Sequence, residues 1–261
     1  MVKTFLVSTA GGRIDGFIKL INSLKRYAAS GWGIRVLFQK YSDEDFEKAE
    51  SSLKEIFGEN YSTDRSDELT GGHLSRVYLL DKYDSDIWML LDDDMEALPF
   101  YTNYDMMSAI VQKDKSIGLI SGNWRRTEGM CKKVQKVNKI LKQDIVYTGG
   151  GLCFRNDVAE IIKAIPRKMY LFDNPLWSIY VYVAGYTNCR YMGSVAVHNI
   201  CTKGGRRRWL SEVSEEKSLP PSEYITTHKG KGKAGSNDEY LICDSSDITD
   251  FAKELHRRNK K

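Results

Sequence analysis

Runs of residues typical of β-strands alternate with runs typical of α-helices along the first half of the chain. The strand-like runs are rich in β-branched and aromatic residues, and the helical runs repeat apolar residues at intervals of three and four. We predict strands within 4–8, 33–40, 86–95 and 116–124, helices near 15–29 and 42–57, and a glycine-led loop entering a helix within 69–85. This alternation predicts an α/β fold, in which a mostly parallel sheet carries helices on both faces and binds ligands at the carboxyl ends of its strands.

The second half of the chain is less regular. We predict a strand, a glycine loop and a second strand within 145–157, a helix over 158–165, a helix or strand over 177–186, and a strand over 194–200. A basic amphipathic helix is predicted over 128–143, with Val134, Val137 and Leu141 on one face and Lys132, Lys136 and Lys139 on the other. We expect one core domain over 1–200 and a basic C-terminal extension over 201–261 that packs on it.

Composition narrows the class of protein. The chain has 261 residues, of which 41% are hydrophobic, and this is enough for one large α/β domain. No apolar run approaches the roughly 20 residues that a membrane helix needs, and the apolar start of the chain is too short for a signal peptide. The five cysteines form no C-x-x-C pair, so neither a disulfide framework nor a zinc site is expected. These features predict a soluble protein of the cytoplasm.

Three consecutive aspartates, Asp92, Asp93 and Asp94, follow directly after the apolar run "IWMLL". Like charges at this spacing repel one another, and a bound cation is one way to offset the repulsion. Carboxylate oxygens at a strand end suit Mg²⁺ or Mn²⁺, and such an ion can bridge phosphates. The alternative is a solvated loop or a helix cap at "DDDMEAL".

Three further features accompany the aspartates, and each has a structural alternative. The tripeptide at 149–151, which includes Gly150, allows a close approach of backbone or substrate, or forms a tight turn. Asp173 lies in a polar gap between apolar runs and is either a functional carboxylate or a turn or cap residue. His198 lies near the end of a predicted strand and is either a metal ligand or a core histidine.

The order of these motifs resembles that of the GT-A class of nucleotide-sugar glycosyltransferases, broadly its large family-2-like group. The resemblance covers about residues 3–200 and is carried by "FLVSTAGGR", "VLFQKYSDED", "GGHLSRVYLLDKYDSDIWMLLDDD", "YTGGGLCFRND", "FDNPLWSIYVYVAGY" and "VAVHN". It implies a Rossmann-like main sheet with a smaller acceptor-side sheet. It also implies an enzyme that moves a sugar from a nucleotide donor, most often a UDP-sugar, to an acceptor hydroxyl with the help of Mn²⁺ or Mg²⁺.

The resemblance also implies roles for single residues. Asp94 would bind the metal directly, Asp92 would contact the ribose or the metal through water, and His198 would complete the metal site. Asp173 would be the general base, which implies inversion at the anomeric carbon. The implied contacts to the nucleotide or donor are Ser8, Thr9, Arg13, Gln39, Arg76, Asp93 and Gly150.

One departure from the family pattern concerns the base. The family usually carries an acidic pair at this position, often Glu-Asp, whereas this chain has Phe172-Asp173-Asn174. The base assignment therefore depends on a single carboxylate.

Clustered basic residues suggest a polyanionic acceptor. Residues 125–142 hold seven basic side chains against one glutamate, and Lys203 with Arg206, Arg207 and Arg208 forms a second cluster just before Trp209. Such groups bind phosphate backbones, and an aromatic side chain can stack on an unpaired base. We predict DNA as the acceptor, at a 5-hydroxymethylated pyrimidine as in phage enzymes that glycosylate their own genomes, with contacts from Lys132, Lys136, Lys139, Arg206, Arg207 and Arg208.

Several alternatives to this acceptor stay open. The basic residues could form a solvated face, or the arginines could hold the donor diphosphate. A GT-A enzyme acting on a polysaccharide or a lipid-linked sugar is a second reading of the motifs. A non-enzymatic nucleic-acid-binding protein with a structural aspartate triplet is a third, and it predicts no hydrolysis of nucleotide sugars.

Overall fold

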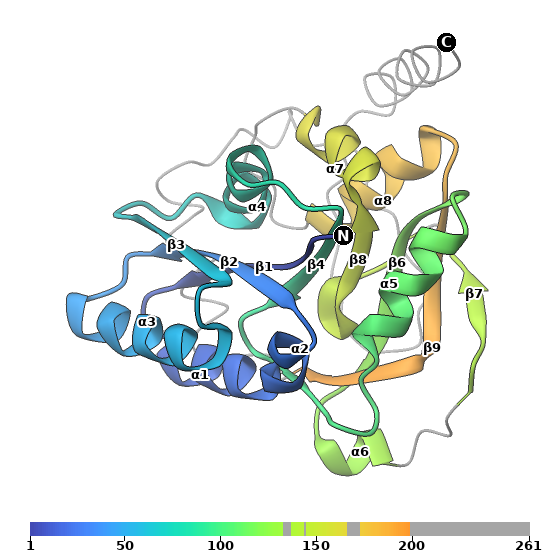
Figure 1. Ribbon diagram of the computed structural model, residues 1–261. Helices are drawn as coiled ribbons and strands as arrows, with labels where there is room; N and C mark the ends of the chain where they lie inside the picture. Colours follow the sequence, from blue (N-terminus) through green and yellow to red (C-terminus); the bar gives the residue numbers. More distant parts are fainter. Residues whose placement is uncertain (133–136, 144, 166–172, 199–261) are drawn as a thin grey trace, which may run out of the picture.

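The computed structural model describes residues 1–132, 137–143, 145–165 and 173–198. Its strands are β1 (Lys3–Ala10), β2 (Trp32–Gln39), β3 (Tyr61–Ser66), β4 (Ile87–Asp92), β5 (Met95–Ala97), β6 (Ile117–Arg125), β7 (Ile140–Lys142), β8 (Leu152–Arg155) and β9 (Thr187–His198). Its helices are α1 (Ile14–Ser23), α2 (Lys25–Ala29), α3 (Asp43–Phe57), α4 (Gly71–Lys82), α5 (Tyr104–Lys113), α6 (Glu128–Lys132), α7 (Asn156–Lys163) and α8 (Asp173–Val183), with a 3₁₀ turn η1 (Thr148–Gly150). Figure 1 shows their arrangement.

The described strands form one sheet in the order β3-β2-β1-β4-β8-β6-β9-β5, and β7 also pairs with β9. The first four of these strands are parallel to one another. The rest of the sheet is mixed: β8 is antiparallel to both β4 and β6, β9 is parallel to β6, and β5 and β7 are antiparallel to β9. The smaller sheet expected on the acceptor side is therefore a continuation of the main sheet.

Alternating side chains of the central strands enter two separate cores. Phe5 and Met89 pack with residues of α1, α2, α3 and α5 on one face. Leu6 and Trp88 pack with residues of α4, α7 and α8 on the other face. Because β1 and β4 are apolar on both faces, they belong in the centre of a sheet covered by helices on each side (Figure 1), as the sequence predicted.

Local signals set several element ends. The Ser42 side chain accepts a hydrogen bond of 3.2 Å from the Asp45 amide and so caps α3, whose first turn is acidic. The single helix predicted near 15–29 is in fact two helices, α1 and α2, separated at Leu24. The edge strand β3 and the helix α5 were not predicted; the sequence of β3, "YSTDRS", lacks the apolar alternation that marks a strand.

The basic helix predicted over 128–143 is wrong. Helix α6 covers only its start, residues 137–139 are not helical, and Ile140–Lys142 form strand β7. Ile140 pairs with Tyr191 of β9, so ladder hydrogen bonds with a neighbouring strand outweigh the local helical pattern. Lys132 and Lys139 therefore do not share one helix face.

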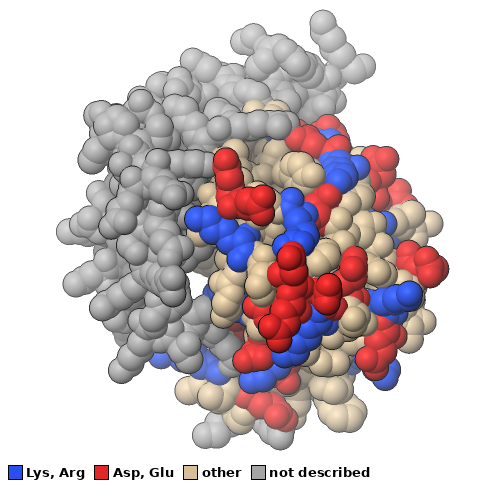
Figure 2. Space-filling view, turned by 90° about the vertical axis from the view of Figure 1, so that its left-hand side faces the viewer, with Lys and Arg blue, Asp and Glu red and all other residues tan. Residues whose placement is uncertain are grey.

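Figure 2 shows acidic and basic side chains interspersed on the described part of one face of the molecule. Among the described residues, several oppositely charged side chains are paired, including Arg65 with Asp43 at 2.8 Å and Lys82 with Asp64. This face therefore offers no uniformly basic patch to a polyanion in its described part. Among the helices that the structure describes, none has the length and apolar character needed to cross a membrane.

Candidate active site at the carboxyl end of β4

Three side chains that are far apart in the sequence meet at the end of β4. Asp92 is the last residue of β4 and lies beside Ser8 of β1 in the ladder. The chain turns at residues 93–94 and enters β5, whose first residue, Met95, pairs with His198 of β9. This pairing places Asp94 beside His198 and brings the end of β9 to the carboxyl edge of the parallel strands.

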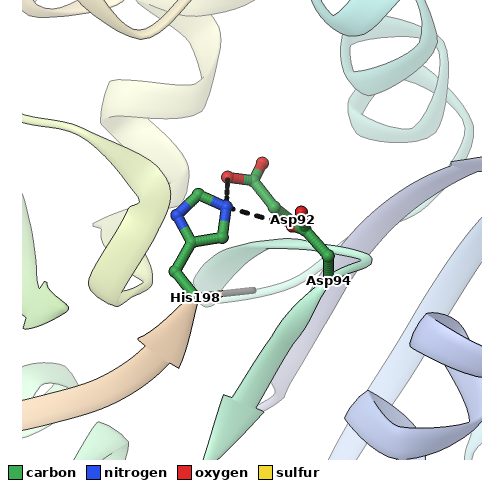
Figure 3. Close-up of side chains that lie close together, drawn as sticks. All are labelled: Asp92, Asp94 and His198. Atoms are coloured by element: carbon green, nitrogen blue, oxygen red, sulfur yellow. Dashed lines mark ion pairs between the residues drawn. The ribbon is translucent and has the colours of Figure 1, made fainter. Parts of the chain in front are cut away.

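The side chains of Asp92, Asp94 and His198 point toward one another (Figure 3). His198 Nε2 lies 3.0 Å from Asp94 Oδ1 and 3.5 Å from Asp92 Oδ2. One potential ligand atom from each residue lies within 4.8 Å of the others. Two carboxylates and an imidazole at this separation fit a hard divalent cation such as Mn²⁺ or Mg²⁺. The predicted trio is thus brought together, and its role as a ligand set remains a prediction.

Asp92 is held on both of its oxygens. Arg76 Nη2 lies 2.6 Å from Oδ1, and the Thr148 hydroxyl donates a hydrogen bond of 2.7 Å to Oδ2. Asp94 Oδ1 instead faces the imidazole of His198. The protein therefore fixes the position of the Asp92 carboxylate, and the more direct contact of Asp94 with a metal stays a prediction.

Burial and the neighbouring negative charges shift the pKa of His198 in opposite directions. Burial lowers the pKa of its imidazole, but the hydrogen bond to Asp94 and the negative charges of Asp92 and Asp94 together raise it above its usual value. The Nδ1 atom is buried and has no hydrogen-bond partner among the described residues. The Trp124 and His198 rings pack nearly perpendicular to each other, with ring centroids 5.6 Å apart. The protein therefore fixes the ring by packing and directs Nε2 at the carboxylates.

Asp93 plays a different part from its two neighbours. Its side chain is buried and lies 2.7 Å from Arg13 Nη1. Burial raises the pKa of this carboxyl to about 6, although the charge of Arg13 acts in the opposite direction. Arg13 also approaches Asp94, at 3.7 Å, from just before α1. Asp93 thus anchors the start of α1 against the end of β4.

The other predicted donor contacts gather at the ends of β1 and β2. The Gln39 amide donates to Ser8 Oγ at 2.7 Å and accepts from the Thr70 amide at 2.7 Å. The hydroxyls of Thr9 and Tyr41 form a hydrogen bond of 2.8 Å. Gln39 and Thr9 therefore make hydrogen bonds within the protein, and their contact with a nucleotide remains a prediction.

The glycines at 149–151 allow η1 to pack tightly. A Cβ on Gly149 would lie 2.6 Å from the Trp124 ring and 2.9 Å from His198 Nδ1. A Cβ on Gly150 would lie 2.2 Å from the backbone of Gly122, where β6 has an irregular register with β9. The predicted close approach is confirmed for the backbone, and the predicted contact of Gly150 with the donor stays a prediction.

The start of α8 reaches the same site. Asp173 is the first residue of α8, and its side chain lies outside the described part of the structure. The next residue, Asn174, donates from Nδ2 to Thr148 Oγ1 at 2.8 Å. Sequence reasoning missed Thr148, Asn174 and Trp124, because their contacts join segments that no local pattern connects.

The predicted phosphate contacts are mostly outside the described residues. Lys139 is exposed and described. Of the others, Lys136, Arg206, Arg207 and Arg208 lie outside the described residues, and only the backbone of Lys132 is described.

No family model matches the sequence, and no curated protein matches it. Solved structures do match. The chain superposes on GalNAc-T7, crystallised with UDP, GalNAc and Mn²⁺, with a TM-score of 0.64 and 12% identity over 97% of this chain and 55% of that one. It superposes on the mannosyltransferase PcManGT from Pyrobaculum calidifontis, in complex with GDP-Man and Mn²⁺, with a TM-score of 0.57 and 15% identity over 84% of this chain and 65% of that one.

A third match is residues 1–349 of S. aureus TarS in complex with UDP-GlcNAc, with a TM-score of 0.57 and 10% identity over 85% of this chain and 69% of that one. At these identities the likeness concerns the fold alone, and the fold is that of the GT-A glycosyltransferases, as the motif order predicted. The chain spans 55% and 65% of the first two of these proteins.

Proposed function

We propose that the protein is a metal-dependent glycosyltransferase that moves a sugar from a nucleotide-sugar donor to an acceptor hydroxyl. The observation that carries this proposal is the cluster of Asp92, Asp94 and His198 at the carboxyl edge of the sheet. In α/β sheets this edge is where ligands bind. The three solved structures described above were obtained with UDP, GDP-Man or UDP-GlcNAc, two of them with Mn²⁺, and this supports the same class of ligands here.

Asp94 and His198 would hold Mn²⁺ or Mg²⁺, with Asp92 close enough to bind it directly or through water. When bound, the cation neutralises charge that develops on the leaving nucleoside diphosphate. Arg76 keeps Asp92 in place, and Arg13 lies beside Asp93 and Asp94, where it adds positive charge near a bound diphosphate. Ser8, Thr9 and Gln39 lie at the neighbouring strand ends, where the nucleoside would bind.

We assign Asp173 as the general base that takes the proton of the acceptor hydroxyl. Its neighbour Asn174 contacts Thr148, and Thr148 contacts Asp92, so the start of α8 lies beside the proposed metal site. A base at this position acting on the face of the sugar opposite the leaving group would invert the anomeric configuration. The expected acceptor is therefore one that enters from the side of α8.

The DNA acceptor remains a prediction of the sequence alone. The helix that would have placed Lys132, Lys136 and Lys139 on one face is not formed, and the cluster at 206–208 lies outside the described residues. A polysaccharide or lipid-linked acceptor stays an open alternative, since the described residues do not distinguish it from DNA.

Release of free nucleoside diphosphate from a panel of nucleotide sugars tests the proposal. We expect release with at least one UDP- or GDP-sugar in the presence of Mn²⁺, and its loss on chelation. Adding DNA that contains 5-hydroxymethylcytosine or 5-hydroxymethyluracil tests the acceptor separately: transfer of sugar to DNA supports that prediction, and donor hydrolysis that DNA does not stimulate removes it. No release with any donor would contradict the transferase itself.

A further inference from the structure

Two consecutive hydrogen bonds link the first turn of α8 to Asp92. Asn174 Nδ2 donates to Thr148 Oγ1 at 2.8 Å, and Thr148 Oγ1 donates to Asp92 Oδ2 at 2.7 Å. Thr148 is buried, and Asn174 is half-buried. The linkage therefore connects a helix of the second half of the chain to the aspartate that ends β4.

Hydrogen-bond chemistry gives this linkage one direction. Asp92 faces Arg76 and accepts hydrogen bonds as a carboxylate, so the single proton of the Thr148 hydroxyl must point to Asp92. The lone pairs of Thr148 are then free to accept, and the group that Asn174 presents must be its NH₂. The direction of one hydrogen bond thus fixes the direction of the other. A residue without a hydroxyl at position 148 would lose both hydrogen bonds.

The surroundings make the linkage rigid. Thr148 belongs to η1, which the contact of Gly150 with Gly122 holds against β6. Helix α8 makes a second hydrogen bond to the segment just before η1, because Ser178 Oγ accepts from the Val146 backbone amide at 3.1 Å. Helix α8 and the segment 146–148 therefore form one unit, and its contact with Asp92 is the Thr148 hydroxyl.

We propose that Thr148 and Asn174 are positioning residues that hold Asp92 in its metal-binding orientation and couple α8, which begins with the proposed base Asp173, to the metal site. This inference rests on the proposed function only for the metal and the base; the linkage itself is a feature of the fold. Partners that orient metal ligands through hydrogen bonds typically change metal affinity about 10–100-fold when they are removed.

The test is the affinity for Mn²⁺, measured by electron paramagnetic resonance of the free ion, without any sugar donor. Thr148→Val removes the hydroxyl and keeps the shape, and we expect its Mn²⁺ affinity to fall about 10-fold or more. Thr148→Ser keeps the hydroxyl and should bind Mn²⁺ within about 3-fold of the wild type. Thr63→Val is the matched control, because it removes a hydroxyl that contacts Glu50 between β3 and α3, away from the site.

Asn174→Ala provides a second, partly exposed position. Because Asn174 acts through Thr148, its effect on Mn²⁺ affinity should be smaller than that of Thr148→Val. For the same reason, the double variant should bind no more weakly than Thr148→Val alone. Thermal unfolding of all variants separates loss of the metal from loss of the fold.

Two results would overturn the inference in distinguishable ways. If Thr148→Val binds Mn²⁺ as tightly as the wild type, or if the two substitutions act additively, the linkage does not position Asp92, and the proposed function is untouched. If the wild-type protein binds no Mn²⁺, with or without UDP, the metal site fails and both the inference and the proposed function fall with it.

Discussion

The two halves of the sheet differ in how their strands are connected, and this difference decides what each contributes to the site. In the first half, residues 1–94, strands β1 to β4 are parallel, and one or two helices separate each from the next. Their carboxyl ends meet at one edge, so Ser8, Gln39 and Asp92 become neighbours through the topology alone. In the second half, residues 95–198, the strands pair both parallel and antiparallel. Its site residues are brought to the end of β4 by contacts between segments that are far apart in the sequence.

The second half is fitted to the first by close packing. Gly150 contacts Gly122, Trp124 packs on His198, and Thr148 reaches Asp92. The first half therefore supplies the three aspartates at the end of β4, and the second half supplies His198 and the side chains that pack against the site. In the proposed function, the second half also carries the acceptor side. Four changes test this division, from the largest expected effect to the smallest.

Asp94→Asn should have the largest effect, because it removes the charge that would hold the metal while keeping the shape. Losing the several kcal/mol that a metal contributes corresponds to on the order of 10³-fold in turnover, so activity should fall to near background. Exhaustive EDTA treatment of the wild-type protein should lower activity to the same extent. Added Mn²⁺ should restore the activity of the wild type but not that of the variant. Asp84→Asn, an exposed change before the opposite end of β4, serves as the control. Full activity after chelation would contradict the metal site.

Asp173→Asn tests the second half directly. A positioned general base contributes on the order of 10²–10⁴-fold, so kcat should fall by that factor. The KM for the donor should stay near its wild-type value, since the proposed nucleotide contacts lie in the first half. Steady-state kinetics with the donor identified in the panel measure both quantities. A variant that loses donor affinity but keeps kcat would move Asp173 to the donor site, and unchanged kinetics would redirect the search to Asp144 or Asp157.

Gly150→Ala tests the packing between the halves. The new methyl group would meet the Gly122 backbone, and overpacking of this kind costs about 1–3 kcal/mol. Urea unfolding should show this loss of stability. Gly129→Ala, at a position in α6 with no atom within 4 Å of the added group, should be neutral or slightly stabilising. Equal stability of the two variants would contradict the packing described for η1.

Lys139→Glu carries the smallest expected effect. If DNA is the acceptor and Lys139 contacts one phosphate, the slope of log K against log salt should become shallower by about 0.9. Lys113→Glu, an exposed change at the end of α5, is the control. Binding titrations over a range of salt concentrations measure the slope. An identical slope for both variants would remove Lys139 from the predicted DNA contacts.

The same contrast explains which features could be predicted from the sequence. Most strands and helices of residues 1–92, though not β3, carry local signals, such as the apolar run before Asp92 and the cap at Ser42. Because the parallel strands end at one edge of the sheet, residues at those ends lie close together. The metal trio could be proposed because the motif order resembles a known class. The Thr148 contact could not, since its hydroxyl reaches Asp92 across 56 positions and nothing in "YTGGG" indicates that partner.

Errors in the predicted secondary structure occur in both halves. The basic pattern at 128–143 has helical spacing, yet Ile140–Lys142 pair with β9. In this short segment, hydrogen bonding to β9 determines the secondary structure more strongly than the helical spacing of the apolar residues does. Strand β3 was missed because it is polar: a strand at the edge of a sheet needs little alternation of apolar and polar residues, so its sequence carries no clear strand signal.

The central claim is that Asp94 and His198 hold the divalent cation between them. Electron spin-echo envelope modulation of the Mn²⁺-UDP complex tests it most directly, because a coordinated imidazole nitrogen modulates the manganese signal. The claim predicts a nitrogen coupling in the wild-type protein that disappears in His198→Ala. A wild-type complex that binds Mn²⁺ without any histidine nitrogen coupling, or a coupling that survives in His198→Ala, would contradict it.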